Sequence, residues 1–329
     1  MNQLSFKNIP IGLVGCGRWG RFILRDLTQL GCEAWVVADS PQSVENATAY
    51  GAQHIIRDIN ELPYFLEGYV IAVPSSLHKD VISKLLDRQR PMYVEKPLTV
   101  DCESARFLAE IAGERLFVMD KWRYHPAIEM LAGIISRSEL GRVRAIRTRR
   151  VGWGNPHGDV DPVWILLPHD LSIILHLLGY LPKPRWAAGE WATQGQMCGL
   201  SGMLGDDPRV WIEVSSSIPI QQRSVCVIFD QGTAMMADPF ADHILLQPGC
   251  GLDPQALPIE RRPISTEMPL LRELRAFLAD LRGGSPPFSS AADGALIVET
   301  VVAMRELAGD QPKPEASRLA ASNCTDSHA

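Results

Sequence analysis

A glycine-rich run near the start of the chain is the feature that most plainly indicates chemistry. It reads Gly15-Cys16-Gly17-Arg18-Trp19-Gly20 and separates a strand-like segment at 11–14 from a helical pattern at 18–30. In such a GxGxxG, the first glycine allows a tight turn, the second lets the backbone approach a pyrophosphate, and the third lets helix and strand pack closely. The positive end of the helix then faces the phosphates. The motif is weak alone, but its position between strand and helix predicts a dinucleotide site formed by these six residues.

Asp39 supports this interpretation and bears on the type of dinucleotide. It ends the second strand-like segment, about 20 residues after the motif, where a carboxylate accepts hydrogen bonds from ribose hydroxyls. The same carboxylate repels a 2′-phosphate, and Ser40 and the two residues after it carry no positive charge. Asp39 also fits a simpler role as the cap of a helix that begins near Pro41. We expect Asp39 and Ser40 to bind the cofactor and the cofactor to be NAD rather than NADP.

Two more segments with polar residues follow the ends of strand-like segments. Their sequences are Val73-Pro74-Ser75-Ser76-Leu77-His78 and Val94-Glu95-Lys96-Pro97. In a doubly wound sheet the carboxyl ends of the strands face the cofactor crevice. We therefore expect a set of cofactor contacts from these turns: Val73, Pro74, Ser75, His78, Glu95 and Lys96. For His78, packing within the first helical turn is the stronger interpretation than direct catalysis.

The elements around these residues alternate as a parallel sheet with crossover helices does. Strands are expected at 11–14, 34–38, 69–73, 92–94 and 116–119, and helices near 18–30, 42–50, 78–88 and 102–112. This α/β pattern predicts a Rossmann-type, doubly wound domain at residues 1–122.

The pattern changes after Trp122. A helix is expected at 126–136, a strand at 143–151 and a buried helix at 162–178, with Asp161 as its N-cap and Pro162 in its first turn. Strands follow near 185–191, 197–203, 209–216, 223–229, 233–237 and 243–247, and amphipathic helices near 270–281 and 291–307. Residues 123–308 are therefore predicted to form an α+β domain with a largely antiparallel open sheet, followed by a disordered tail at 309–329.

Taken together, these motifs resemble the family of glucose-fructose oxidoreductase, inositol dehydrogenase and rhizopine-catabolism proteins (Gfo/Idh/MocA). The resemblance rests on the glycine motif, Asp39, the turn before His78 and above all Glu95-Lys96-Pro97, and extends over nearly the whole chain. It implies that Lys96 lies beside the nicotinamide and hydrogen-bonds the substrate hydroxyl that becomes a carbonyl. A cation near oxidised nicotinamide also has a lowered pKa, which suits proton exchange. The alternative is a surface lysine paired with Glu95. A cis Lys96-Pro97 bond is compatible with the sequence.

The helix at 162–178 is expected to supply the second catalytic residue. Ile165, His169, Ile173 and His176 share one face of it, and His169 matches the family's catalytic histidine, whereas His176 fits a core position. Many relatives carry an aspartate where this chain has Ile165. His169 therefore lacks that carboxylate and is left with Asp170, a water or no partner, or Lys96 handles the proton alone.

Substrate contacts are expected where this helix faces the second sheet. The segment from Trp164 to Ser172 resembles a subgroup associated with sugar nucleotides and polysaccharides, and Trp164 is included with Lys96 and His169 as a substrate contact. Arg149 is expected to reach an anionic group, although a solvated strand face explains it equally well. Arg123 and Tyr124 are expected to contact the sugar, although Tyr124 also fits a packed aromatic.

Composition excludes several other classes of protein. Of 329 residues, 46% are hydrophobic and 21% charged, and the net charge is −6, so binding to nucleic acid or to membranes is not expected. The seven cysteines are scattered and form no CxxC pair, which favours free thiols, no metal site and a cytoplasmic protein. Relatives usually pair through the second sheet, so a homodimer or homotetramer is expected.

These observations predict an NAD-dependent dehydrogenase that moves a hydride between a secondary hydroxyl of a sugar or sugar nucleotide and nicotinamide. Two alternatives remain at this stage. One is an NAD-using enzyme with no net redox change, such as an epimerase, lyase or glycosidase. The other is a non-catalytic NAD or sugar sensor on the same scaffold, which the missing carboxylate at Ile165 keeps open.

Overall fold

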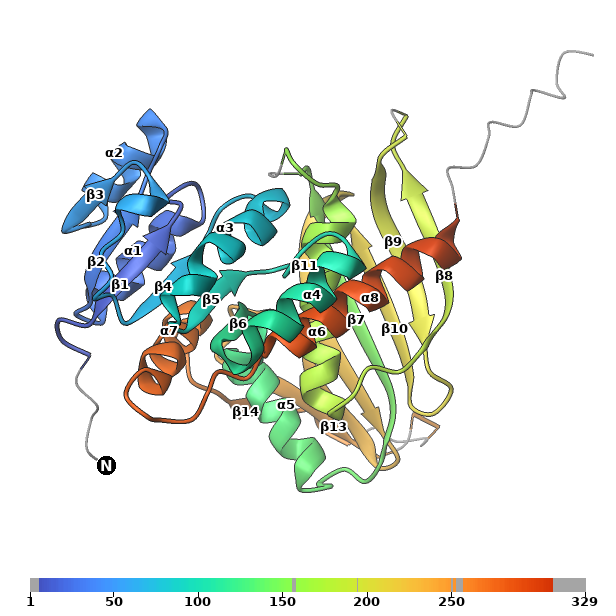
Figure 1. The fold of residues 1–329 in the computed structure, drawn as a ribbon. Coiled ribbons are helices and arrows are strands. Elements are labelled where there is room, and N and C mark those ends of the chain that lie inside the picture. The colour runs from blue at the N-terminus through green and yellow to red at the C-terminus, as the bar shows by residue number, and fades with distance from the viewer. Residues whose placement is uncertain (1–5, 156–157, 194, 250, 253–256, 310–329) are drawn as a thin grey trace, which may run out of the picture.

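The computed structural model describes residues 6–309 except 156–157, 194, 250 and 253–256. Within these ranges two sheets stand side by side (Figure 1), so the predicted α/β class is confirmed. The tail predicted to be disordered lies outside the described residues, apart from Gly309. No helix in the described ranges has the length and hydropathy needed to cross a bilayer.

The first sheet is parallel, with six strands among the described residues. In spatial order they are β3 (His54–Ile56), β2 (Glu33–Val37), β1 (Pro10–Val14), β4 (Gly68–Ile71), β5 (Met92–Glu95) and β6 (Leu116–Met119). The order reverses direction between β1 and β4, which is the place where doubly wound sheets bind nucleotides. The predicted strands are confirmed, and β3 is an addition at the edge.

Helices and short 3₁₀ turns connect these strands. The helices are α1 (Gly20–Gln29), α2 (Pro41–Ala49), α3 (His78–Leu85) and α4 (Cys102–Ala112), and the 3₁₀ turns are η1 (Ile59–Glu61), η2 (Ser75–Leu77), η3 (Leu86–Arg88), η4 (Gly113–Arg115) and η5 (Lys121–Tyr124). The strands are nearly all apolar because both faces of the sheet are covered.

The second sheet is mixed and has eight described strands. In spatial order they are β14 (Glu260–Pro263), β13 (His243–Pro248), β12 (Gly232–Met236), β11 (Ser217–Phe229), β7 (Val143–Trp153), β10 (Arg209–Ser215), β9 (Met197–Leu204) and β8 (Pro184–Trp191). All neighbours are antiparallel except β7 and β10, which run parallel. The prediction of a largely antiparallel sheet is therefore confirmed.

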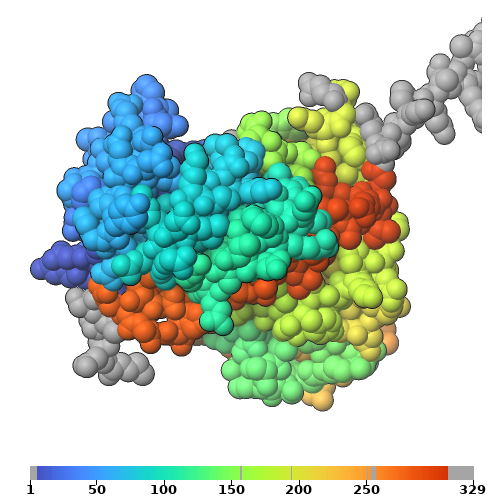
Figure 2. Space-filling view, in the orientation of Figure 1, coloured from blue at the N-terminus to red at the C-terminus, as the bar shows by residue number. Residues whose placement is uncertain are grey.

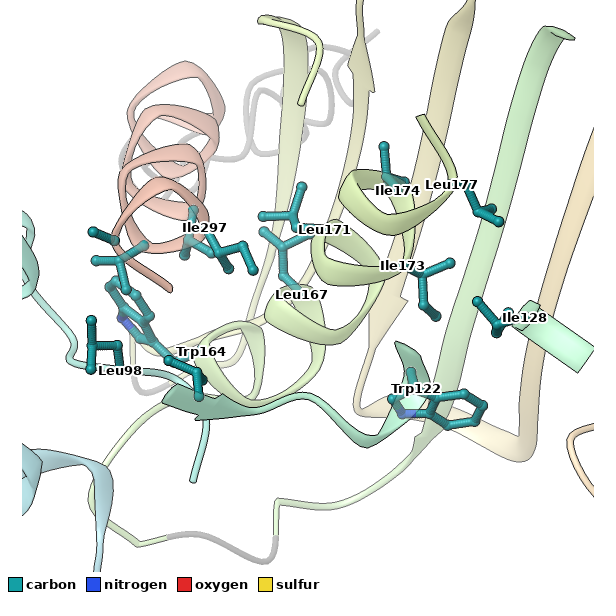
Figure 3. Packing of buried hydrophobic residues seen from close by; sticks show 14 of the residues in the cluster. Leu98, Trp122, Ile128, Trp164, Leu167, Leu171, Ile173, Ile174, Leu177 and Ile297 are labelled. Atoms are coloured by element: carbon teal, nitrogen blue, oxygen red, sulfur yellow. The ribbon is translucent and has the colours of Figure 1, made fainter. Parts of the chain in front are cut away.

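Four helices complete the second part of the chain: α5 (Pro126–Ser136), α6 (Pro162–Leu178), α7 (Pro269–Asp280) and α8 (Ala291–Ala308). Helix α6 lies between α8 and the sheet, and its apolar side chains fill that space (Figure 3). Asp161 caps α6 through the amides of Val163 and Trp164, as expected from the sequence, and Gly179 ends the helix at φ +78°.

Helix α7 comes late in the chain, but it packs with the elements of the first sheet. Leu274 and Phe277 join the core formed by β1 and α1, and the Phe277 ring lies 5.0 Å from that of Tyr93. The space-filling view shows this late segment, in orange, against the blue N-terminal part (Figure 2). The chain thus crosses between its two halves more than once, and the boundary at residues 122 and 123 stays a prediction.

Candidate active site

The glycine-rich loop between β1 and α1 leaves its backbone open to a ligand. Gly15 has φ +94°, and a side chain there would meet the carbonyl oxygen of Ala72 at 2.6 Å, whereas nothing lies within 4 Å of the place where Gly17 would carry one. Asn46 holds the loop from α2 by donating from Nδ2 to the Cys16 carbonyl, at 2.9 Å. This open and fixed backbone beside a helix N-terminus fits the phosphates of a dinucleotide.

Asp39 lies exposed at the end of β2, on the same edge of the sheet. The side chain that caps α2 is that of Ser40, which accepts from the Ser43 amide at 3.2 Å. The alternative role of Asp39 as the cap is therefore not what the structure shows, and the Ser40 hydroxyl is engaged within the helix. One neighbour was missed from sequence: Arg57, which follows β3, donates from Nη1 to the Asp39 carbonyl at 3.3 Å.

Glu95 joins the glycine-rich loop to the turn that carries Lys96. Its carboxylate accepts a hydrogen bond from the indole Nε1 of Trp19, and also one from the Lys96 amide at 3.2 Å. Burial raises the pKa of Glu95, while Lys96 and Lys121 oppose that rise. The Lys96-Pro97 bond is cis. The two hydrogen bonds of Glu95 thus link the glycine-rich loop to the turn that carries Lys96, beside the predicted cofactor site.

His78 joins the same turn to the end of β4. Its Nδ1 lies 2.8 Å from the Pro97 carbonyl oxygen and its Nε2 lies 3.1 Å from that of Val73. The ring is buried, and burial lowers its pKa. This arrangement matches the packing role favoured for His78 in the sequence.

Lys96 reaches across from the first domain to helix α6. Its ammonium donates to the Ile165 carbonyl at 3.1 Å. Pro168 lies inside this helix and has no N–H, so it cannot donate to the carbonyl four residues earlier, that of Trp164, next to Ile165. Burial lowers the pKa of Lys96, against the opposing effect of Glu95 and Asp120. The lysine is thus a partly desolvated amine rather than a surface ion pair.

His169 follows Ile165 by one helical turn and is the second predicted catalytic residue. Its Nδ1 is buried without a hydrogen-bond partner among the described residues, and its ring lies 6.3 Å from that of Trp122. Burial holds its pKa well below 6.5, and Lys96 and Arg150 lower it further. Asp170 is not its partner, because that carboxylate accepts from Arg150 Nε at 2.7 Å.

A cavity of about 470 Å³ opens beside these residues, between the glycine-rich loop and the second sheet. Ile165 and His169 line it, and Trp153, 77% exposed, stands at its rim. The side chains that carry charge are all basic: Arg18, Lys121, Arg150 and Arg223. The remaining polar lining includes Ser215, Ser216 and Gln221.

Lys121 is a site residue that the sequence interpretation missed. It follows β6 directly, and its Nζ lies 3.8 Å from the centre of the Trp19 ring. Burial lowers its pKa to about 8. Its place one residue after Asp120, at the end of the last parallel strand, was the available signal, since that edge of the sheet faces the crevice.

Five of the six predicted substrate contacts do not line this cavity. Lys96 differs from the other four because it donates to the carbonyl of Ile165, which does line the cavity. Arg123 is buried and donates to Ser172, Phe288 and Asp293, and the Tyr124 hydroxyl accepts from the Phe288 amide at 2.8 Å. Trp164 packs in the core around α6. Arg149 points to the other face of the sheet, where its Nε donates to Glu213 at 2.8 Å. The polar groups of Arg123, Tyr124, Trp164 and Arg149 are engaged within the protein or turned away, so we do not assign these four residues to the substrate.

Comparison with known proteins agrees with this site. Residues 9–118 match the model of an oxidoreductase family described as having an NAD-binding Rossmann fold. Residues 9–118 thus match the NAD-binding Rossmann domain of the Gfo/Idh/MocA oxidoreductases. The resemblance stated from the motifs and the prediction of an NAD cofactor are thereby confirmed.

Curated relatives of this chain are named as dehydrogenases. An inositol 2-dehydrogenase of Burkholderia cenocepacia is 25% identical over 95% of this chain and 98% of its own length. A UDP-N-acetylglucosamine 3-dehydrogenase of Acidithiobacillus ferrooxidans is 27% identical, over 54% of this chain and 57% of its own length.

Solved structures extend the likeness of fold to both halves of the chain. That of the Acidithiobacillus ferrooxidans enzyme has a TM-score of 0.79 at 21% identity, and covers 91% of this chain and 97% of its own. A levoglucosan dehydrogenase in complex with NADH and levoglucosan has a TM-score of 0.80 at 15% identity, over 92% and 97%. At these identities the likeness establishes the fold, including the second sheet.

Proposed function

We propose that this protein oxidises a secondary hydroxyl of a sugar or sugar nucleotide with NAD as hydride acceptor. One observation carries the proposal. The Lys96 ammonium donates to the carbonyl of Ile165, and Ile165 and His169, one helical turn apart, both line a cavity that Arg18 of the glycine-rich loop also lines. A desolvated amine and a neutral imidazole are thus held together where the cofactor's reactive end is expected.

The residues divide the work as follows. Bound NAD supplies the hydride acceptor at C4 of its nicotinamide. Burial lowers the pKa of Lys96, and in its unprotonated form the amine would take the proton from the substrate hydroxyl as the substrate carbon gives up a hydride, leaving a ketone and a lysine ammonium. His169 stays neutral and hydrogen-bonds the substrate oxygen. We assign the adenosine end to Asp39, on the sequence argument, and expect the enzyme to act in the cytoplasm.

The test is NADH formation with a panel of sugars, in the native protein and in Lys96→Ala. The panel contains myo-inositol, levoglucosan and UDP-N-acetylglucosamine. We expect NADH to accumulate with at least one sugar, and Lys96→Ala to lower kcat about 100-fold to 10,000-fold while the Kd for NAD is unchanged. Product without NADH would instead favour an enzyme with no net redox change, and full activity in Lys96→Ala would remove Lys96 from the mechanism.

We further propose a homo-oligomer formed through the outer face of the second sheet. A row of cross-strand neighbours crosses this face and is largely apolar: Trp186, Met203, Trp211, Arg147, Cys226, Met235 and Leu245. Trp186 is 52% exposed. A second copy would cover this row. Light scattering should give a multiple of the 36.4 kDa chain mass, and a monomer at micromolar concentration would contradict the proposal.

A further inference from the structure

The cavity beside His169 has an excess of positive charge that the proton chemistry does not require. Arg18, Lys121, Arg150 and Arg223 line it, and its lining includes no Asp or Glu. Neutral sugars are recognised through hydrogen bonds to both donors and acceptors, for which this many cations are not needed. The distribution of charge therefore bears on the chemical class of the substrate.

Arg150 is the cation whose charge is already balanced. Its guanidinium donates from Nε to Asp170 at 2.7 Å and lies 4.4 Å from the Trp122 ring centre. Both side chains of the pair are nearly inaccessible, at 4% and 1% exposed. Removing one partner of such a buried pair would leave an uncompensated charge, so Arg150 is part of the floor of the site rather than a free anion-binding group.

Arg223 is the cation that remains. It lies directly opposite Arg150 in the pairing of β11 with β7, so both side chains share the inner face of the sheet. Within the described ranges, no carboxylate lies at ion-pair distance from Arg223 and no hydrogen bond is made by its guanidinium. Burial lowers its pKa, and so does Arg150, while Asp170 opposes that fall. Because Asp170 is already paired with Arg150, the half-buried Arg223 guanidinium has lost part of its hydration without a direct ion pair in return.

Lys121, which follows β6, adds a second cation that makes no direct ion pair among the described residues, although Glu95 and Glu273 act on its charge from farther away. Its ammonium rests on the Trp19 ring. Arg18 also lines the cavity, but it belongs to the glycine-rich loop, where we expect the cofactor phosphates to bind. Of the neutral polar residues in the lining, Ser215 donates to Glu190 and Ser216 donates to the Cys198 carbonyl, so Gln221 on β11 is the neutral side chain that we expect to donate to an anion.

We propose that Arg223, with Lys121, binds an anionic group of the sugar substrate, either a carboxylate or a phosphate. This inference rests on the proposed function, because it assigns the substrate class of the same site. It gives Arg223 on β11 the role that the sequence interpretation gave to Arg149 on β7, whose side chain lies on the other face of the sheet.

The test compares matched neutral and anionic sugars by titration calorimetry on the NAD-loaded protein. The pairs are glucose with glucuronate, glucose with glucose 6-phosphate, and N-acetylglucosamine with UDP-N-acetylglucosamine. We expect the anionic member of at least one pair to bind about tenfold tighter or more, since a charge-assisted hydrogen bond contributes that much. The glucuronate pair separates a carboxylate from the two phosphate sources.

Arg223→Gln should abolish this preference, and Arg223→Lys should restore part of it, while the Kd for NAD stays the same in both variants. Arg144→Gln is the matched control, because Arg144 lies on neighbouring β7 outside the cavity, near Asp207 and Asp230.

Equal binding within every pair, no binding of any anionic sugar, or an unchanged preference in Arg223→Gln would each overturn the inference. NADH formation with a neutral sugar alone would overturn it while leaving the proposed function intact. If the protein bound NAD and preferred anionic sugars but formed no NADH, the proposed function would be overturned and this inference would stand.

Discussion

The ammonium of Lys96 donates to the backbone carbonyl of Ile165, at 3.1 Å, and so connects the end of β5 to helix α6. Because the acceptor is a main-chain oxygen, the bond does not depend on the side chain at position 165. The side chain there does set the charge around the amine. Isoleucine supplies no carboxylate, so burial dominates and the pKa of Lys96 is lowered.

This arrangement predicts the pH dependence of oxidation. The amine must be unprotonated to accept a proton, so kcat/KM for the sugar should fall as pH falls through the lowered pKa of Lys96. Ile165→Asp should raise that pKa, because a nearby carboxylate favours the charged amine, and the midpoint of the profile should move up by roughly one unit or more.

The pH profile of kcat/KM, measured by NADH formation, checks this prediction. Ile165→Val is the control, since it keeps the site apolar and should leave the midpoint in place. If the Ile165→Asp variant kept the native midpoint, Lys96 would not be the titrating group.

Cofactor choice should depend on Asp39 and Arg57 together. The Asp39 carboxylate would repel the 2′-phosphate of NADP, while Arg57, bonded to the Asp39 carbonyl, would attract it. We expect the native protein to bind NAD more tightly than NADP. In Asp39→Ala, the ratio of the Kd for NADP to the Kd for NAD should fall about tenfold.

Dissociation constants for NAD and NADP, measured by fluorescence titration, give this ratio. The double variant Asp39→Ala, Arg57→Ala should bind NADP less well than the single variant does. If the ratio is the same in the native protein and in Asp39→Ala, the adenosine end lies elsewhere.

His176 should make the fold sensitive to acid. It lies on α6 with its ring 5.4 Å from that of Phe288, and burial lowers its pKa to about 4 from an ordinary 6.5. Below 6.5 the unfolded chain takes up this proton before the folded one does, so the free energy of unfolding falls as pH drops toward 4.

His176→Leu should remove that contribution. Between about pH 7 and about pH 5 the native protein should lose roughly 1 to 2 kcal/mol more of its free energy of unfolding than the variant does. Guanidinium unfolding at the two pH values measures the difference. The same loss in both proteins would mean that His176 titrates alike in the folded and unfolded chains.

Local signals predicted most of the fold. Helix α6 has an Asp-Pro start and a Gly after its last turn, and its predicted bounds match the observed ones. β3 and β14 were missed because segments of three or four residues at a sheet edge carry little periodicity. The parallel pairing of β7 with β10 was also missed, since which distant strands become neighbours depends on the packing of the whole sheet.

The site was predictable where a motif fixes a residue at a strand end, as with Gly15, Asp39 and Lys96. Site residues were not predictable where their role depends on which face of a strand they occupy. Arg149 and Arg150 are adjacent in sequence, yet one points to Glu213 and the other to Asp170, on opposite faces of the sheet. Register with β11 then places Arg223 beside Arg150, and that pairing is a tertiary property.

Deuterium transfer tests the central claim most directly. The sugar of the panel that gives NADH is supplied with deuterium on the carbon to be oxidised, and the NADH formed is analysed by mass spectrometry. The proposed function predicts one deuterium in the nicotinamide ring of every NADH produced. Unlabelled NADH, or bound NAD that no sugar reduces, would contradict hydride transfer in this cavity.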